Sequence, residues 1–469
     1  MSQRLGRAAL TLLLVASPTL ASGFYFGENG AKALTQGGAF AGQADDLTAI
    51  EHNPAGLAQQ QGYGFLLDVE LLRHDINFQR KDPGGVVVNG VNPIQNGPGP
   101  FFLPNLGLSY GSPVAGRRFT LAFGVYGPPS VGKYGFPVPN YAKENASFVA
   151  VPRKYAAERY ALIDNDVIIL YPSLAAAYEL HPRFSVGLAV QYVYSAFKFR
   201  QAAYSGLFEP TRQRDEDPDF DSIVTVDMKG RPSVTGILGV MVKPTDQLSI
   251  GASFRPRIPI SATGTMNFAL GEIATGLGTV VTGNQADFTT TLPLEAKVGA
   301  HFQATDALGL NADFVYQGWD SVQELLFTPN GISTKIGSAD ATLVAPIHIP
   351  KHWVATFSGR LGASYALQSV TLRAGAWYET EAAPDAYTNI DFLHFSRLFV
   401  TAGVGYHVGH FEILAGGAFT PTVTKEVGDS EVRAQSTDPA TPGGIIGVGT
   451  YSSGGWVATA GVRGSFGNP

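Results

Sequence analysis

Hydrophobic and polar residues alternate with a period of two in long segments, from about residue 62 to the end of the chain. In 184–194 one face carries Phe184, Val186, Leu188, Val190, Tyr192 and Tyr194, and the opposite face carries Ser185, Gly187, Ala189 and Gln191. The segments 248–254 and 370–378 repeat this arrangement. The pattern predicts β-strands with one apolar face and one small or polar face.

The length of these segments favours strands that cross a membrane. They run to roughly 10–18 residues, against ~5–6 in a typical soluble strand, which is enough to cross a tilted ~30 Å hydrocarbon core. We count about fourteen, an even number that suits a closed bacterial barrel. They are 62–79, 101–112, 117–127, 164–179, 183–200, 222–242, 246–268, 287–304, 308–325, 350–367, 370–380, 397–409, 411–424 and 450–466.

The connections between the segments alternate between short and long, as in outer-membrane barrels. Short ones at 180–182, 305–307 and 409–410 are predicted to be periplasmic turns. Long ones near 80–100, 128–163, 201–221, 326–349 and 425–449 are predicted to be extracellular loops. The charged run 212–217 lies in one of these loops and is interpreted as solvated loop surface.

The first residues predict export. Arg4 and Arg7 precede a short apolar run over 8–15, and small residues at 19–21 offer a cleavage site. This is the layout of a signal peptide, and the run is too short to span a bilayer as a helix. We therefore divide the chain into a signal peptide over 1–21, an N-terminal segment over 22–60 and a barrel over 61–469.

Composition agrees with an exported barrel. Charged residues make up only 15% of the chain, glycine is abundant and cysteine is absent. The formal net charge of -6 excludes a strong general attraction to nucleic acid. The histidines show no metal-ligand spacing, and neither a metal nor a cofactor is expected.

Residues 22–60 interrupt the alternation. Small residues dominate 31–44, and Pro54 forbids a continuous helix or strand through that point. A barrel of about fourteen strands has a lumen wide enough to leak. The segment is therefore expected to be either a periplasmic extension or a hatch that plugs the lumen.

Several motifs resemble a known family, the FadL/TodX type of outer-membrane transporters for long-chain fatty acids and aromatic hydrocarbons. The most specific are in the N-terminal segment: Gly30 to Leu34, Asp45 with Asp46, and the run Asn53, Pro54, Ala55, Gly56 and Leu57. Further matches are at 158–160, 171–178, 292–295 and 316–319. The chain departs from the family by ending in Phe466-Gly467-Asn468-Pro469 rather than on an aromatic residue.

The resemblance implies a fourteen-stranded barrel in the bacterial outer membrane, plugged by the hatch, with passive transport as its function. A hydrophobic ligand would be captured at extracellular loops, held in a lumen pocket and released laterally into the lipid. By the same resemblance Phe24 would reach the pocket, and Asn53, Pro54 and Ala55 would form the hatch turn. The expected partners are the ligand and outer-membrane lipid, and a monomer is expected.

Two groups are further candidates for ligand contact. Phe101 and Phe102, with neighbouring apolar loop residues, are candidates for capture, although such residues also pack against other loops. Arg255 and Arg257 fall on the inward phase of their strand and could hold a carboxylate. The inward set holds charges of both signs, so we favour the alternative that its members form ion pairs that brace barrel and hatch. The set includes Glu295, Lys297, Asp313, Arg360, Arg373 and Glu412.

Other functions remain as alternatives. Gly107-Leu108-Ser109-Tyr110-Gly111 matches the esterase nucleophile elbow, but it lies in an alternating strand rather than a strand-to-helix turn. An outer-membrane lipase using Ser109 is therefore the competing enzyme hypothesis. A general porin or a surface adhesin would share the barrel without the hydrophobic pocket.

Overall fold

The computed structural model describes residues 25–88, 92–97, 99–130, 132–136, 156–204, 221–435 and 443–467. The expected signal peptide, Phe24 and the charged run 212–217 lie outside these residues. No helix among the described residues is both long and apolar enough to cross a membrane.

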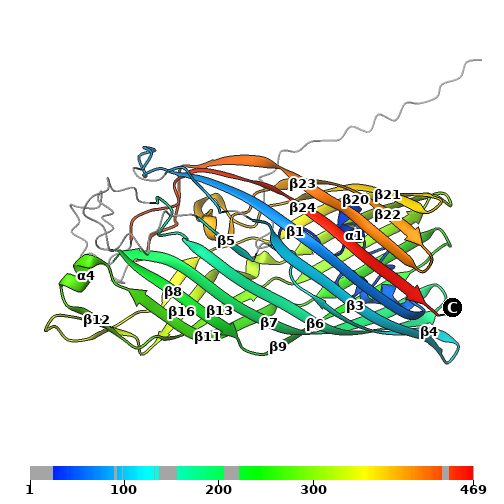
Figure 1. Ribbon diagram of the computed structural model, residues 1–469, viewed down its shortest axis with the longest axis horizontal. Helices are drawn as coiled ribbons and strands as arrows, with labels where there is room; N and C mark the ends of the chain where they lie inside the picture. Colours follow the sequence, from blue (N-terminus) through cyan, green and yellow to red (C-terminus); the bar gives the residue numbers. More distant parts are fainter. Residues whose placement is uncertain are drawn as a thin grey trace, which may run out of the picture.

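Fourteen strand crossings form one closed ring (Figure 1). Each crossing pairs antiparallel with the next, and β1 (Gly62–Arg80) pairs with β24 (Gly449–Phe466) to close the ring. The crossings between them are β3 (Phe101–Val114), β4 (Arg117–Tyr126), β6 (Asp164–His181), β7 (Phe184–Tyr204), β8 and β9 (Asp221–Gly230, Ser233–Val242), β10 and β11 (Leu248–Arg255, Ile258–Ala269), β13 and β14 (Gln285–Leu292, Glu295–Gln303), β15 and β16 (Leu308–Gln317, Glu324–Asn330), β19 and β20 (Ile347–Pro350, Thr356–Leu367), β21 (Val370–Glu379), β22 (Arg397–Val408) and β23 (Phe411–Val427). The predicted barrel is confirmed.

The two ends of the barrel differ, as the alternating connections predicted. At one end the strands join through short turns, such as the hairpin at Ala115 and Gly116, whose positive φ values of 51° and 74° suit a tight turn. At the other end lie the long connections, with β2 (Ile94–Gln95), β5 (Lys133–Gly135), α4 (Glu272–Gly276) and a small sheet of β12 (Thr279–Thr282), β17 (Ser333–Ile336) and β18 (Thr342–Leu343). We call these the short-turn end and the long-loop end.

The predicted apolar faces point outward. On β7, Leu188 and Val190 are exposed while Ala189 and Gln191 between them are buried. The same holds on β21, where Leu372 is exposed and Arg373 is buried. An apolar outer surface with a small and polar interior is the arrangement that lipid requires.

Four neighbouring crossings, from β8 and β9 to β15 and β16, are broken partway along, and the next one, β19 and β20, is interrupted at 351–355. In the first four the breaks lie at 231–232, 256–257, 293–294 and 318–323, the last of which contains η3 (Trp319–Ser321). Pro232, Pro256 and Pro293 occupy the first three breaks and cannot donate to a strand ladder. The sequence predicted each crossing as one continuous segment, and the breaks are a finding of the structure.

The proline breaks also change which residues face inward. Arg255 is buried before the break in its crossing, and Ile258 and Ile260 are buried after it. Because the break holds two residues rather than one, the alternation shifts by one position. Arg257, predicted to face inward, is therefore outside, with half of its side chain exposed and paired with Asp320.

The breaks divide these four crossings into two halves. The membrane half, β9, β10, β14 and β15, is apolar outside. The loop half, β8, β11, β13 and β16, is the reverse: Asp227, Lys229, Thr263 and Thr289 face outward, whereas its inward residues are apolar. The loop half therefore has the outer surface of a water-soluble sheet, and we expect it to extend beyond the lipid.

Residues 25–60 lie inside the ring, with α1 (Ala31–Thr35), α2 (Ala49–His52) and η1 (Pro54–Gln59) (Figure 1). Asp313 of β15 accepts hydrogen bonds from the amides of Phe40 (2.8 Å) and Ala41 (2.7 Å). Across the ring, Asp68 of β1 accepts from the Ala31 amide at 2.8 Å. Strands on opposite sides thus hold one compact segment, which we call the hatch.

Inward-facing glycines let the hatch backbone approach the wall. A Cβ at Gly251 would lie 1.9 Å from the Ala41 carbonyl oxygen, and one at Gly187 would lie 2.2 Å from the Pro54 carbonyl carbon. Neither contact leaves room for a side chain, so small residues on both surfaces are a condition of this packing.

Candidate functional site

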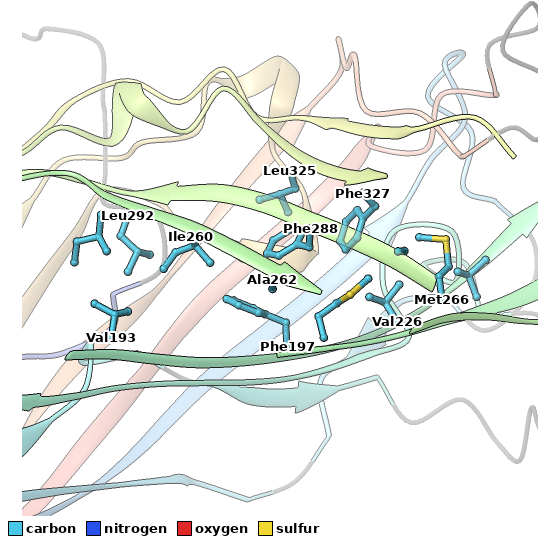
Figure 2. Packing of buried hydrophobic residues seen from close by; sticks show 14 of the residues in the cluster. Val193, Phe197, Val226, Ile260, Ala262, Met266, Phe288, Leu292, Leu325 and Phe327 are labelled. Atoms are coloured by element: carbon cyan, nitrogen blue, oxygen red, sulfur yellow. The ribbon is translucent and has the colours of Figure 1, made fainter. Parts of the chain in front are cut away.

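An apolar cavity lies inside the loop half of the barrel. Figure 2 shows the side chains of Phe197, Ile260, Phe288 and Leu325 converging from different strands. The ring centroids of Phe197 and Phe288 are 5.0 Å apart, within the range of favourable aromatic contacts. We call this cavity the inner pocket. Its lining residues are Tyr25, Pro128, Ser130, Gly132, Asn165, Val167, Ile169, Phe197, Phe199, Ile260, Phe288, Thr290, Leu292, Leu325 and Phe392.

A second apolar cavity, the outer pocket, continues toward the long-loop end. It shares Phe199, Leu325 and Phe392 with the inner pocket. Its other lining residues are Ala161, Leu162, Gln201, Val224, Val226, Met266, Phe327, Ile347, Ile349 and Asp391. The free volumes are only about 30 Å³ and 40 Å³, so a ligand must displace side chains to enter. Long, flexible apolar side chains such as Met266 permit such repacking.

A charged chamber lies on the hatch side of the inner pocket and shares Tyr25 and Pro128 with it. Arg255 lies 3.3 Å from Glu51 of α2 and 3.5 Å from Glu295. Lys297 contacts Glu295 at 3.2 Å. These buried pairs join α2 of the hatch to β10 through Glu51, and β10 to β14 through Glu295. The favoured prediction, that inward charges brace barrel and hatch, agrees with this geometry.

Tyr25 and Phe26, at the start of the hatch, separate the inner pocket from the charged chamber. The Phe26 amide donates to the Pro129 carbonyl at 2.5 Å, and the Phe26 ring stacks on His74 with centroids 4.5 Å apart. Arg397 donates to the Tyr25 carbonyl, and the Tyr25 ring meets the edge of Trp319 at 5.1 Å. Tyr25 and Phe26 are therefore fixed beside Pro128 and Pro129.

The barrel wall changes at the same place. β4 ends at Tyr126, and Gly127 to Ser130 are not in a strand. β3 pairs with β1 from Phe101 onward but with β4 only from Leu106. Over 101–105 the described part of the wall thus has no strand ladder on the β4 side. This stretch, bounded by 101–105 of β3, residues 127–130 and 167–170 of β6, is called the wall gap.

The predicted hatch motifs form the turn that faces β9 and β10. Asn53 donates from its amide to the carbonyls of Ala41 (2.9 Å) and Val240 (3.0 Å), and its oxygen accepts from the Ala55 amide at 3.2 Å. Pro54 begins η1. One asparagine therefore caps the short helix and ties it to the wall.

The aspartates of the hatch motif hold its short-turn side. Asp45 pairs with Lys32 at 2.7 Å, and Lys32 holds the pKa of Asp45 below its usual range despite burial. Asp46 accepts from the Thr48 amide at 2.8 Å and pairs with Arg463 of β24. These contacts fix the chain between α1 and α2.

His52 in α2 is neutral in this environment. Burial lowers the pKa of His52 to about 3, and one ring nitrogen lies 2.9 Å from the Asn29 carbonyl, to which it donates. The other ring nitrogen is 3.9 Å from Glu28, which instead pairs with Arg360. The His52–Glu28 contact is therefore not an ion pair at neutral pH.

The predicted ligand-contact residues do not form one group. Arg255 lines the charged chamber, between two carboxylates, and Arg257 lies outside the barrel. Phe101 and Phe102 begin strand β3, as the predicted segment 101–112 has it, and do not lie in a loop as their proposed capture role assumed. The Phe102 side chain faces outward, and Phe101 lies at the wall gap. Whether any of them contacts ligand stays a prediction.

Ser109 lies in the middle of β3, which pairs on both sides, so the strand-to-helix turn of an esterase is not present there. Among the described residues, no cluster of histidine, aspartate and glutamate has the arrangement of a metal site.

Three residues of this region were not predicted to contact ligand. Tyr25 follows Phe24 in the N-terminal segment, Trp319 ends the family-like run 316–319 and lies in a strand break, and Phe392 lies in η5 (Ile390–Phe392) of the connection between β21 and β22. Phe392 lines both pockets because this connection folds over the inside of the barrel. Irregular segments lack the periodicity that identifies inward residues in strands.

Comparison with known proteins agrees with this geometry. Residues 12–466 match the model of a family described as outer membrane protein transport protein (OMPP1/FadL/TodX). A search of curated protein sequences finds no match.

Solved structures share the fold at low sequence identity. A FadL homologue from Pseudomonas aeruginosa has 17% identity and a TM-score of 0.72, covering 95% of this chain and 100% of its own. The toluene transporter TbuX of Ralstonia pickettii has 17% identity and a TM-score of 0.62, with coverages of 94% and 99%. The toluene transporter TodX of Pseudomonas putida has 16% identity, the same TM-score and the same coverages. The chain belongs to the OMPP1/FadL/TodX family of outer-membrane transport proteins, and its transmembrane β-barrel lies in the outer membrane.

Proposed function

We propose that the protein carries hydrophobic small molecules passively through the outer pocket and inner pocket and releases them sideways into the bilayer at the wall gap. One observation carries this proposal. The outer and inner pockets share lining residues, and the inner pocket is also lined by Pro128, which borders the wall gap. An apolar ligand moving along this path exchanges one apolar environment for another and needs no energy source.

The hatch supports lateral exit over passage to the periplasm. Beyond the inner pocket a ligand would meet Glu51, Arg255, Glu295 and Lys297, all buried and hydrogen-bonded or paired. Opening these pairs to an apolar molecule would leave charges without partners, at a cost of several kcal/mol, ~3–5 for a single broken pair. The path through the wall gap avoids that cost.

The ligand class is supported by the apolar lining and by the relatives. TbuX and TodX are described as toluene transporters. Both pockets are lined with aromatic and aliphatic side chains, as sites for such molecules are. A general porin would instead need an open polar lumen, and the hatch occupies that space here.

The wall gap can be tested with cysteine pairs, because the chain has no cysteine of its own. A Cβ at Gly127 would lie 3.4 Å from Leu103 Cδ1 across the gap and 2.8 Å from the Ile169 carbonyl oxygen, so the uptake of the double variant before cross-linking is the reference. Cross-linking the double variant Leu103→Cys, Gly127→Cys with a short reagent should lower toluene uptake into proteoliposomes about tenfold, and a reductant that cleaves the link should restore it.

The matched control is the pair Leu188→Cys and Leu238→Cys, which are register partners on the outer face of β7 and β9. Cross-linking this pair should leave uptake unchanged. Equal uptake before and after cross-linking at the wall gap would rule out lateral release there. Flux of a hydrophilic sugar comparable to toluene flux would support the porin alternative.

A further inference from the structure

The polar groups of the two pockets contain an acid and no described base. The inner pocket is lined by the polar residues Tyr25, Ser130, Asn165 and Thr290, and the outer pocket by Gln201 and Asp391. None of the described lining residues of either pocket is lysine or arginine. A carboxylate entering here would lose its water and meet no cation among the described lining residues in return.

Lys351, the cation beside the acid of the outer pocket, is already committed to that carboxylate. Lys351 is buried, lies 2.5 Å from Asp391, and has its ammonium group 5.7 Å from the centre of the Phe392 ring. It therefore sits just behind the one acid of the outer pocket, with its charge compensated. A second carboxylate beside Asp391 would compete with an existing buried pair.

The charged chamber offers no spare cation either. Its described lining holds three bases, Arg255, Lys297 and Arg360, and four acids, Glu28, Glu51, Glu295 and Glu379. Each base is within ion-pair distance of at least one of these acids. Glu379 is in turn paired with Arg397 at 2.9 Å. A ligand that reached this chamber with a negative charge would therefore find every described lining base already paired with a carboxylate.

We propose that the ligand of the two pockets is electrically neutral, such as a hydrocarbon or an alcohol, and that the pockets reject the carboxylate of a fatty acid. This inference rests on the proposed transport function and narrows its substrate class. Thr290 has the one buried side-chain group in the described lining of the two pockets that lacks a hydrogen-bond partner, and a neutral ligand could provide that partner. Its hydroxyl lines the inner pocket, is buried and has no hydrogen-bond partner among the described residues. A ligand hydroxyl or carbonyl would satisfy it.

The test compares two probes of equal chain length, decanol and decanoate, with the full-length protein in lipid nanodiscs at pH 8, where decanoate is ionised. Decanol is expected to bind at least about tenfold more tightly, because only decanoate must bury a charge. Equal or tighter binding of decanoate would overturn the inference while leaving transport intact. If neither probe binds, the proposed function fails instead.

The pair Lys351 and Asp391 provides a second readout. Asp391→Asn should leave the Lys351 charge without its partner and raise the affinity for decanoate severalfold relative to the affinity for decanol. Adding Lys351→Met to that variant should remove the gain. A folded Asp391→Asn variant whose ratio of decanoate to decanol affinity equals that of the unaltered protein would show that charge does not govern selection. If this variant does not fold, the comparison of the two probes on the unaltered protein still decides.

Discussion

The membrane half and the loop half of the four broken crossings share the same strands but present opposite surfaces. In the membrane half the outside is apolar and the inside carries glycine, serine and ion pairs against the hatch. In the loop half the outside is polar and the inside is an aromatic and aliphatic pocket. The change occurs over two residues in each of three proline-containing breaks. One crossing can therefore present an apolar outer face to lipid along one stretch and an apolar inner face to ligand along the next. This requires the alternation to shift by one position between the two stretches.

The largest expected effect comes from placing a charge in the loop-half interior. Phe288→Lys puts an ammonium group among Phe197, Phe327 and Leu325 without an acid to pair with. We expect toluene binding to fall about a hundredfold or more, since burying an unpaired charge costs several kcal/mol. Thr289→Lys, the next residue on the polar outer face, should bind toluene normally. Isothermal titration of both variants measures the contrast, and equal losses would show that the two faces of β13 are not as assigned.

The second prediction concerns the hatch inside the membrane half. Gly251→Val adds a side chain where a Cβ already meets the Ala41 carbonyl oxygen at 1.9 Å. The hatch must move away from β10, so ion conductance through single barrels in a planar bilayer should rise severalfold or more. Gly359→Val is the control, because a Cβ there meets no other atom within 4 Å. Equal conductance in the two variants would argue against the hatch as the seal.

The third prediction compares the outer surfaces of the membrane half and the loop half. Val298→Lys on β14 faces lipid and should lower the free energy of unfolding in lipid vesicles by about 2–4 kcal/mol. Lysine at Thr289, on the same crossing beyond the break, should change it by less than about 0.5 kcal/mol because that face meets water. Urea titrations followed by tryptophan fluorescence give both values. A large loss for both would place the loop half inside the bilayer.

The smallest expected effect is a dependence on pH in the hatch. The folded pKa of His52, about 3, is below its unfolded value of 6.5, so the unfolded state binds more protons as pH falls. As the pH falls from 6.5 to 5.5, His52 therefore lowers the free energy of unfolding of the hatch by about 1 kcal/mol. His52→Gln should reduce the rise in conductance over that range relative to the unaltered protein. An identical rise in both would assign the pH response to other groups.

The sequence predicted the barrel well because its signal is repeated in every strand. The segments 370–380 and 397–409 correspond to β21 (Val370–Glu379) and β22 (Arg397–Val408). The charged residues predicted to face inward do so wherever the alternation is unbroken, as Arg360 and Arg373 show. Burial on one face fixes the register strongly, so residues of that kind can be assigned from parity alone.

The candidate site could be predicted only in part, and the reason is physical. Arg257 was placed inward because parity was carried across Pro256, although a proline within a strand signals a break. The run Ile258, Ile260 and Ala262 contained the missing information, since its apolar phase is opposite to that of Arg255. Phe392 could not have been assigned, because its position depends on how a long connection folds back into the barrel.

Hydrophobic ligand is expected to occupy the inner pocket on its way to the wall gap. Crystals soaked in bromobenzene, with anomalous scattering recorded at the bromine edge, test it most directly. The predicted result is a bromine peak among Phe197, Phe288 and Leu325. Peaks confined to the charged chamber or to the outer surface of the barrel would contradict it.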